Sequence, residues 1–79
     1  MSPAEMAKEA ADAANANSRM TMVFQKGRKR PQGFPRGELL CENPDGNRVY
    51  SFDPMRVLAW LTAKNFVKAR GMDTMRGPA

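Results

Sequence analysis

Apolar residues are concentrated in the middle of the chain, and their spacing changes from one segment to the next. Residues 20–24, MTMVF, place Met20, Met22 and Phe24 at alternate positions. Because successive side chains of a strand point to opposite faces, this spacing predicts a short strand with these three side chains on one face. The two residues between them then lie on the other face.

Residues 38–53, ELLCENPDGNRVYSFD, carry the strongest local signal in the chain. Pro44 suits the second position of a type I turn, and Gly46 can take the left-handed conformation that closes a three-residue hairpin loop. The resulting register pairs Glu42 with Arg48, Cys41 with Val49 and Leu40 with Tyr50. Opposite charges near the tip and apolar pairs behind it favour a hairpin, because directly opposed side chains stabilise a sheet.

A helix is predicted directly after the hairpin. Asp53 and Pro54 are residue types preferred at the cap and the first position of a helix. The residues of its apolar stripe are Val57, Leu58 and Leu61, with Trp60 at the edge. Phe66 would fall on the opposite face, so we expect the helix to end near Lys64.

A second helix is predicted at the start of the chain. Ser2 and Glu5 have the spacing of a capping box, and Pro3 occupies the first helical position. The Ala-rich segment that follows should end near residues 15–18. Alanine has high helix propensity but little area to bury, so we expect a marginal helix that frays or stays loose unless a partner covers it.

Together these elements predict an α+β fold, in which a small antiparallel β-sheet of one strand plus a hairpin packs under one main C-terminal helix. The predicted organisation is a marginal N-terminal Ala-rich helix or loose arm over 1–18, a single α+β domain over 19–68 with a basic loop at 25–37, and a flexible tail over 69–79. A chain of 79 residues makes one domain at most. It buries only about 60% of its unfolded surface, so its core is small.

Composition narrows the classes of function. The chain has no histidine and one cysteine, Cys41, so the commonest general acid–base group and the usual zinc ligand sets are missing. Cys41 lies in a predicted strand, where we expect a small buried hydrophobe. Acidic residues are scattered over strand, turn and cap positions, without a nucleophile–base arrangement. We therefore predict a non-enzymatic protein that needs no cofactor and no metal.

The sequence also predicts a cytoplasmic protein. No apolar run approaches the roughly twenty residues that a membrane helix needs, so we expect no membrane association. No charged and then apolar leader opens the chain. A single cysteine fits a reducing compartment.

Positive charge is concentrated in one segment. The formal net charge is +5, and the loop over residues 25–37 holds five basic residues and no acidic one. Clustered Lys and Arg neutralise phosphates and release counterions, which favours sequence-independent binding of DNA or RNA. The candidate nucleic-acid-binding residues are Lys26, Arg28, Lys29, Arg30, Phe34 and Arg36 in the loop and Arg48 in the hairpin. Phe34 can stack on an unpaired base. The alternative interpretation is a solvated linker, with Phe34 packing the loop onto the core.

Residues 34–61 resemble the wing-plus-helix half of excisionase and MerR-like winged-helix proteins. Phe34-Pro35 leads into a hairpin, Asp53 caps the following helix, and that helix carries Val57, Trp60 and Leu61. The resemblance implies that the hairpin is a wing and that Arg36 and Arg48 contact the DNA backbone. That family reads bases with a helix-turn-helix just before the Phe-Pro step, where this chain has a predicted strand and the basic loop, so the resemblance does not extend to base reading.

Two hypotheses about function remain. The first is a small basic protein that binds the phosphate backbone of nucleic acid. The second is a small accessory or inhibitor protein, of the kind that phages and other mobile elements encode, which binds a host protein; Met-rich apolar strands favour it. A monomer and a homodimer built through residues 20–24 as an edge strand are compatible with both.

Overall fold

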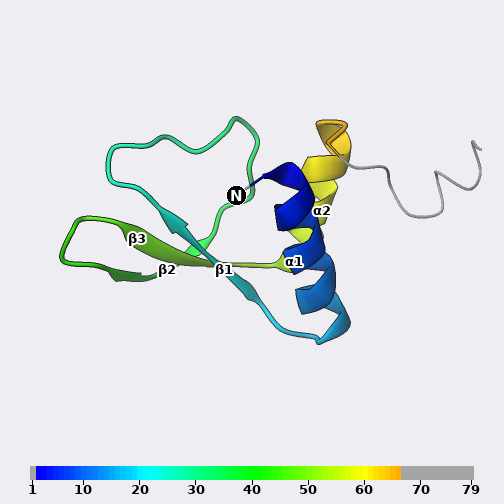
Figure 1. Ribbon diagram of the computed structural model, residues 1–79, viewed down its shortest axis with the longest axis horizontal. Helices are drawn as coiled ribbons and strands as arrows, with labels where there is room; N and C mark the ends of the chain where they lie inside the picture. Colours follow the sequence, from blue (N-terminus) through cyan, green and yellow to red (C-terminus); the bar gives the residue numbers. More distant parts are fainter. Residues whose placement is uncertain (1, 67–79) are drawn as a thin grey trace, which may run out of the picture.

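Two helices and three strands follow one another in the order α1, β1, β2, β3, α2 (Figure 1). Their bounds are Pro3–Asn15 for α1, Met20–Phe24 for β1, Glu38–Glu42 for β2, Arg48–Phe52 for β3 and Pro54–Ala63 for α2. The computed structural model describes residues 2–66, so the tail predicted over 69–79 lies outside the described residues. The predicted α+β class is confirmed.

The strands form one antiparallel sheet in the order β1-β3-β2. Met20 lies opposite Phe52, and Met22 lies opposite Tyr50. Because paired side chains share a face of the sheet, the face predicted for the methionines also carries the aromatic residues of β3. Met20, Met22 and Phe52 are buried there. Strand β3 is central, and β1 and β2 are both edge strands.

The turn of the hairpin is confirmed. Gly46 has a φ of 91°, a left-handed conformation that glycine adopts without strain. Its N–H donates a hydrogen bond of 2.9 Å to the carbonyl oxygen of Asn43. The two predicted pairs nearest the turn are present: Glu42 with Arg48, and Cys41 with Val49.

The third predicted pair, Leu40 with Tyr50, is wrong. Tyr50 lies opposite Leu39, because β2 has a register shift between Leu39 and Cys41. A β-bulge inserts one extra residue into a strand and moves every pair beyond it by one position. Leu39 and Leu40 are identical residues, so the hydrophobic pattern carried no signal that could place the bulge.

The prediction that Cys41 is buried is also wrong, since its side chain is exposed. Cys41 lies opposite Val49, which in turn lies opposite Val23 on β1. These three residues form a row on the face of the sheet that points away from Met22. Val23 is 57% exposed, so within the described part of the chain this face is open to solvent.

Both helices begin and end on local signals in the sequence. Ser2 caps α1 in a reciprocal capping box with Glu5, and the Asp53 carboxylate accepts a hydrogen bond from a backbone N–H in the first turn of α2. Each helix ends in a Schellman motif, in which the last N–H bonds to the carbonyl five residues earlier. The left-handed residues of these motifs are Asn17, with φ 53°, and Asn65, with φ 61°.

The two helices pack against each other at one end of the sheet (Figure 1). Ala10 of α1 and Val57 and Leu61 of α2 are fully buried and join the core with the methionines of β1. The Ala-rich helix, expected to stay loose without a covering partner, is covered by α2. The other end of the sheet, near the hairpin turn, lies against the basic loop over residues 25–37.

Candidate nucleic-acid interface

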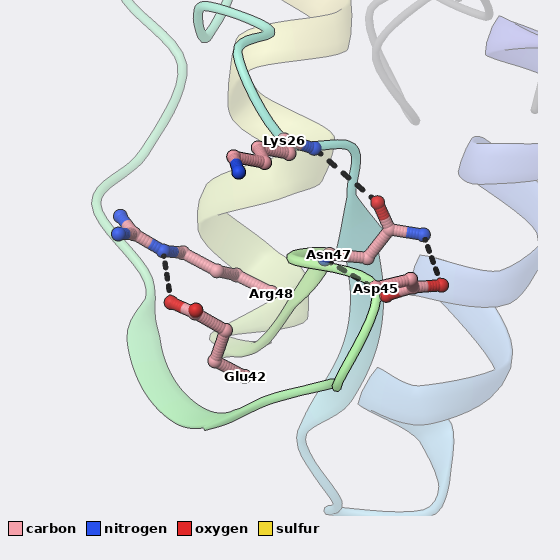
Figure 2. A network of polar contacts seen from close by, with 5 residues as sticks. All are labelled: Lys26, Glu42, Asp45, Asn47 and Arg48. Atoms are coloured by element: carbon pink, nitrogen blue, oxygen red, sulfur yellow. Dashed lines mark hydrogen bonds and ion pairs between the residues drawn. The ribbon is translucent and has the colours of Figure 1, made fainter.

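The basic loop, residues 25–37, is fastened at its start to the tip of the hairpin (Figure 2). The backbone N–H of Lys26 donates a hydrogen bond of 3.3 Å to Asn47 Oδ1. Asn47 is held in turn by the Asp45 carboxylate, which accepts from its backbone N–H at 3.0 Å and from its Nδ2 at 3.2 Å. The Asp45 carboxylate is therefore bonded within the turn, and in Figure 2 it lies on the opposite side of the turn from the Lys26 ammonium group.

The end of the loop is fastened to the core by aromatic contacts. The Phe34 ring packs edge-on against Phe52 and Trp60, with centroids 5.3 Å and 5.0 Å away. The indole Nε1 of Trp60 donates a hydrogen bond of 3.0 Å to the carbonyl oxygen of Gln32. Gly37 passes so close to the buried Phe52 ring that an added Cβ would lie 2.6 Å from it. Both ends of the loop are thus fixed.

Arg30, in the middle of the loop, lies across the hairpin end of the sheet. Its guanidinium carbon is 4.6 Å from the Tyr50 ring centroid and 5.9 Å from that of Phe24, both within cation–π range. Hydrogen bonding from Arg30, and secondarily from Arg48, lowers the pKa of the Tyr50 hydroxyl. Two guanidinium groups from separate segments therefore meet at one tyrosine.

Arg48 reaches this position from β3. It is two residues from Tyr50, so the two side chains share the face of the sheet that the helices cover at its other end. Arg48 Nε lies 3.0 Å from Glu42 Oε1, and both side chains are about half exposed. An exposed pair of this kind contributes little to stability. The ion pair uses Nε, and the terminal nitrogens of Arg48 extend beyond it (Figure 2).

These contacts enclose a pocket of about 200 Å³ between the loop and the hairpin, which we call the basic pocket. Its charged and phenolic lining residues are Lys26, Arg28, Arg30, Glu42, Arg48 and Tyr50. Four cationic side chains thus face one carboxylate, and that carboxylate is already paired with Arg48. The arrangement is suited to attract an anion.

The remaining three candidate residues lie elsewhere. Lys29 lines a neighbouring hollow between the loop, β1 and α1, which Glu9 also lines. Arg36 is exposed close to the start of β2, outside the lining of the basic pocket. Phe34 is half-buried in the aromatic cluster, where its main contacts are with the core.

Two residues of this site were not among the predicted ones. Tyr50 was interpreted only as an apolar member of the hairpin, although its place two residues after Arg48 puts both side chains on one face of a strand. Asn47 was assigned no role, and it fastens the loop to the hairpin. The first could have been found from strand periodicity, whereas the second depends on a contact between segments distant in sequence.

Comparisons of the chain with models of protein families, with curated proteins and with solved structures gave no match. The resemblance to winged-helix proteins therefore stays a prediction. Within residues 2–66, no helix is both long and apolar enough to cross a bilayer. The same part of the chain holds no group of three or more side chains able to ligate a metal ion.

Proposed function

We propose that this protein is a non-enzymatic module that binds the phosphate backbone of DNA or RNA. The proposal is carried by one observation: cationic side chains from two separate segments, the basic loop and the hairpin, line a single pocket. Lys and Arg gathered in this way attract a polyanion and release its counterions. Backbone contacts of this kind carry no sequence information, so we expect affinity without base specificity.

The fastening of the loop supports the same proposal. Two ordered attachments, at Lys26 and at Phe34, limit the conformations that the loop can adopt. A cationic loop that is already ordered loses less conformational entropy when it binds than a free linker does. The solvated-linker interpretation expects the attachment at Phe34 but not the one at Lys26.

Salt dependence is the first test. A mobility-shift assay at 50 mM salt should retain a complex with duplex DNA. If about four phosphates are neutralised, raising the salt to 200 mM should weaken binding by about 100-fold. Failure to retain any complex at 50 mM salt, with duplex or single-stranded probes of DNA and RNA, would contradict the proposal.

A triple variant tests which cations are responsible. K26Q/R28Q/R48Q removes three pocket charges and leaves the packed Arg30 in place. Each lost phosphate contact should lower the slope of log affinity against log salt by about one, so most of the salt dependence should disappear.

The matched control removes the same net charge from the helices. Lys8, Arg56 and Lys64 are exposed and lie on α1, on α2 and at the end of α2. The variant K8Q/R56Q/K64Q should retain most of the affinity and of the salt slope. Equal losses in the two variants would show that net charge alone, and not the pocket, governs binding.

The alternative function, binding of a protein partner, is favoured by the open face of the sheet. Val23 lies on this face and is 57% exposed, and Leu40, at the bulge of β2, is 51% exposed. A partner captured from a bacterial lysate that resists nuclease and is lost in V23K/L40K would support this function over the first. Strand β1 is an edge strand, as the homodimer hypothesis requires, and light scattering distinguishes a monomer from a dimer.

A further inference from the structure

The size of the basic pocket restricts what can enter it. It encloses about 200 Å³ and is less open than the two hollows beside α1. Pockets that hold whole small molecules usually measure about 300–1,000 Å³. The basic pocket is therefore matched to a single small anionic group, and a complete nucleotide would exceed it.

The positions of three cations that line the pocket suit a single small anionic group. Arg30 is half-buried, and its guanidinium carbon lies 4.6 Å from the Tyr50 ring centroid, which limits where the guanidinium can move. Figure 2 shows the Lys26 ammonium and the Arg48 guanidinium on the same side of the hairpin tip. Planar guanidinium groups bind phosphate oxygens in pairs, and an ammonium group adds a point charge.

A phosphate within a nucleic-acid strand can contact the cations at the mouth of the pocket, but it enters the recess itself poorly. It carries one negative charge, and sugars on both sides hold it on the outline of the strand. A terminal phosphomonoester carries about −1.5 to −2 at pH 7 and is attached on one side only. It can therefore enter a recess end-on and present three oxygens to cations around it.

We infer that the basic pocket binds the terminal phosphate of a nucleic-acid strand. The inference rests on the proposed function and makes it more specific: strand ends are preferred over internal sites. Lys29 and Arg36, outside the pocket, would then contact the internal phosphates that follow.

The experiment compares single-stranded oligonucleotides of one sequence that carry a 5′-phosphate, a 3′-phosphate or hydroxyl groups at both ends. Fluorescence anisotropy at 150 mM salt and pH 7.5 measures each affinity. We expect a terminal phosphate at one of the two ends to raise affinity at least about ten-fold, since two further charge-assisted hydrogen bonds are worth that much. A preference for a phosphate at either end supports the inference.

Variants matched in charge test the site. R30Q and K26Q each remove one cation from the pocket and should abolish the preference for the phosphorylated end. K29Q removes one cation from the same loop but outside the pocket, so it should weaken all oligonucleotides alike and keep the preference. Lys26 is exposed, so K26Q remains informative if R30Q disturbs the packing of the loop.

Inorganic phosphate gives a second readout. Tyr50 is the single tyrosine of the chain, so its ionisation can be followed by absorbance near 295 nm. Phosphate bound between Arg30 and Arg48 should raise the pKa of Tyr50 back toward its ordinary value, relative to sodium chloride at the same ionic strength. Equal effects of phosphate and chloride would overturn the inference.

The outcomes separate the two proposals. Equal affinity for phosphorylated and hydroxyl ends overturns the inference about strand ends and leaves backbone binding in place. A complete lack of binding to all three oligonucleotides, at 50 mM as well as 150 mM salt, overturns both.

Discussion

At the scale of single residues, the contact between Arg30 and Tyr50 has the widest consequences. It joins the middle of a loop to the central strand of the sheet and brings one cation of the basic pocket to within 4.6 Å of the Tyr50 ring centroid. A cation–π contact of this kind contributes only modestly to stability when it is exposed. Its larger effect here is to orient the guanidinium beside that of Arg48.

This contact predicts the titration of Tyr50. The pKa of Tyr50 should lie below its ordinary value of about 10, because Arg30 and then Arg48 favour the phenolate. In R30Q the pKa should rise, and in K29Q it should not change. Absorbance near 295 nm measures both. An unchanged midpoint in R30Q would mean that Arg30 does not lie on Tyr50 in solution.

The sign of the linked effect on stability follows from the same shift. A folded-state pKa below the unfolded one stabilises the folded protein above pH 10, and this contribution disappears as the pH falls through the folded pKa. At pH 7 the hydroxyl is neutral in both states. The Tyr50 shift is therefore read from a titration at alkaline pH, and it does not change stability near neutral pH.

At the scale of elements, the boundaries of the helices depend on caps a few residues long. Asp53 ends the hairpin and starts α2, so one side chain fixes the point where the chain changes direction. Its carboxylate accepts from the Met55 N–H at 3.0 Å and lies 3.9 Å from the Arg56 guanidinium. The first of these contacts satisfies a backbone donor that the helix itself leaves unpaired.

Removing this cap should destabilise the fold. D53A should lower the free energy of unfolding by about 1 kcal/mol, measured by urea denaturation followed through the fluorescence of Trp60. D53N keeps a capping oxygen and should cost much less. If the two variants were equally destabilised, the charge on Asp53 and not its capping hydrogen bond would be responsible.

At the scale of the whole molecule, one face of the sheet is covered by the helices at one end and by the basic loop at the other. The helices cover the end with Met20, whereas the basic loop covers the end with Phe24 and Tyr50. Phe52 lies between them and also contacts Phe34 of the loop. All six aromatic residues of the chain form one connected cluster that runs beneath both. The core and the basic pocket are therefore continuous, so a substitution that disturbs the packing of one should also affect the other.

The contact between α1 and α2 can be tested by overpacking. Ala10 has no exposed surface, so A10L should destabilise the protein by about 1–3 kcal/mol. The control A4L adds the same side chain at an exposed position of α1 and should change stability by less than about 0.5 kcal/mol. Urea denaturation of both variants gives the comparison. Equal stability of A10L and A4L would show that α1 is not packed on α2.

The sequence by itself determined the features that depend on neighbours a few residues apart. The capping box at Ser2, the turn closed by Gly46, the cap at Asp53 and the methionine face of β1 were all predicted, because steric and hydrogen-bonding preferences act over one turn or one pleat. The cations of the loop and the hairpin can be read directly from the sequence. Their grouping in space was not visible.

The tertiary structure decided which distant segments meet. Cys41 is exposed because it lies on the face of the sheet that the helices and the basic loop leave open, a result that no local pattern of apolar residues contains. The bulge in β2 gives a partner on β3 to Leu39 and not to its identical neighbour Leu40, and the sequence does not distinguish the two. The path of the basic loop sends Lys26 and Arg30 to the pocket and Lys29 to another hollow, whereas Arg28 lines both. These cations look alike in the sequence. The contacts of Phe34 with the core and of Arg30 with Tyr50 set the path of the loop, and that path decides which cations enter the pocket.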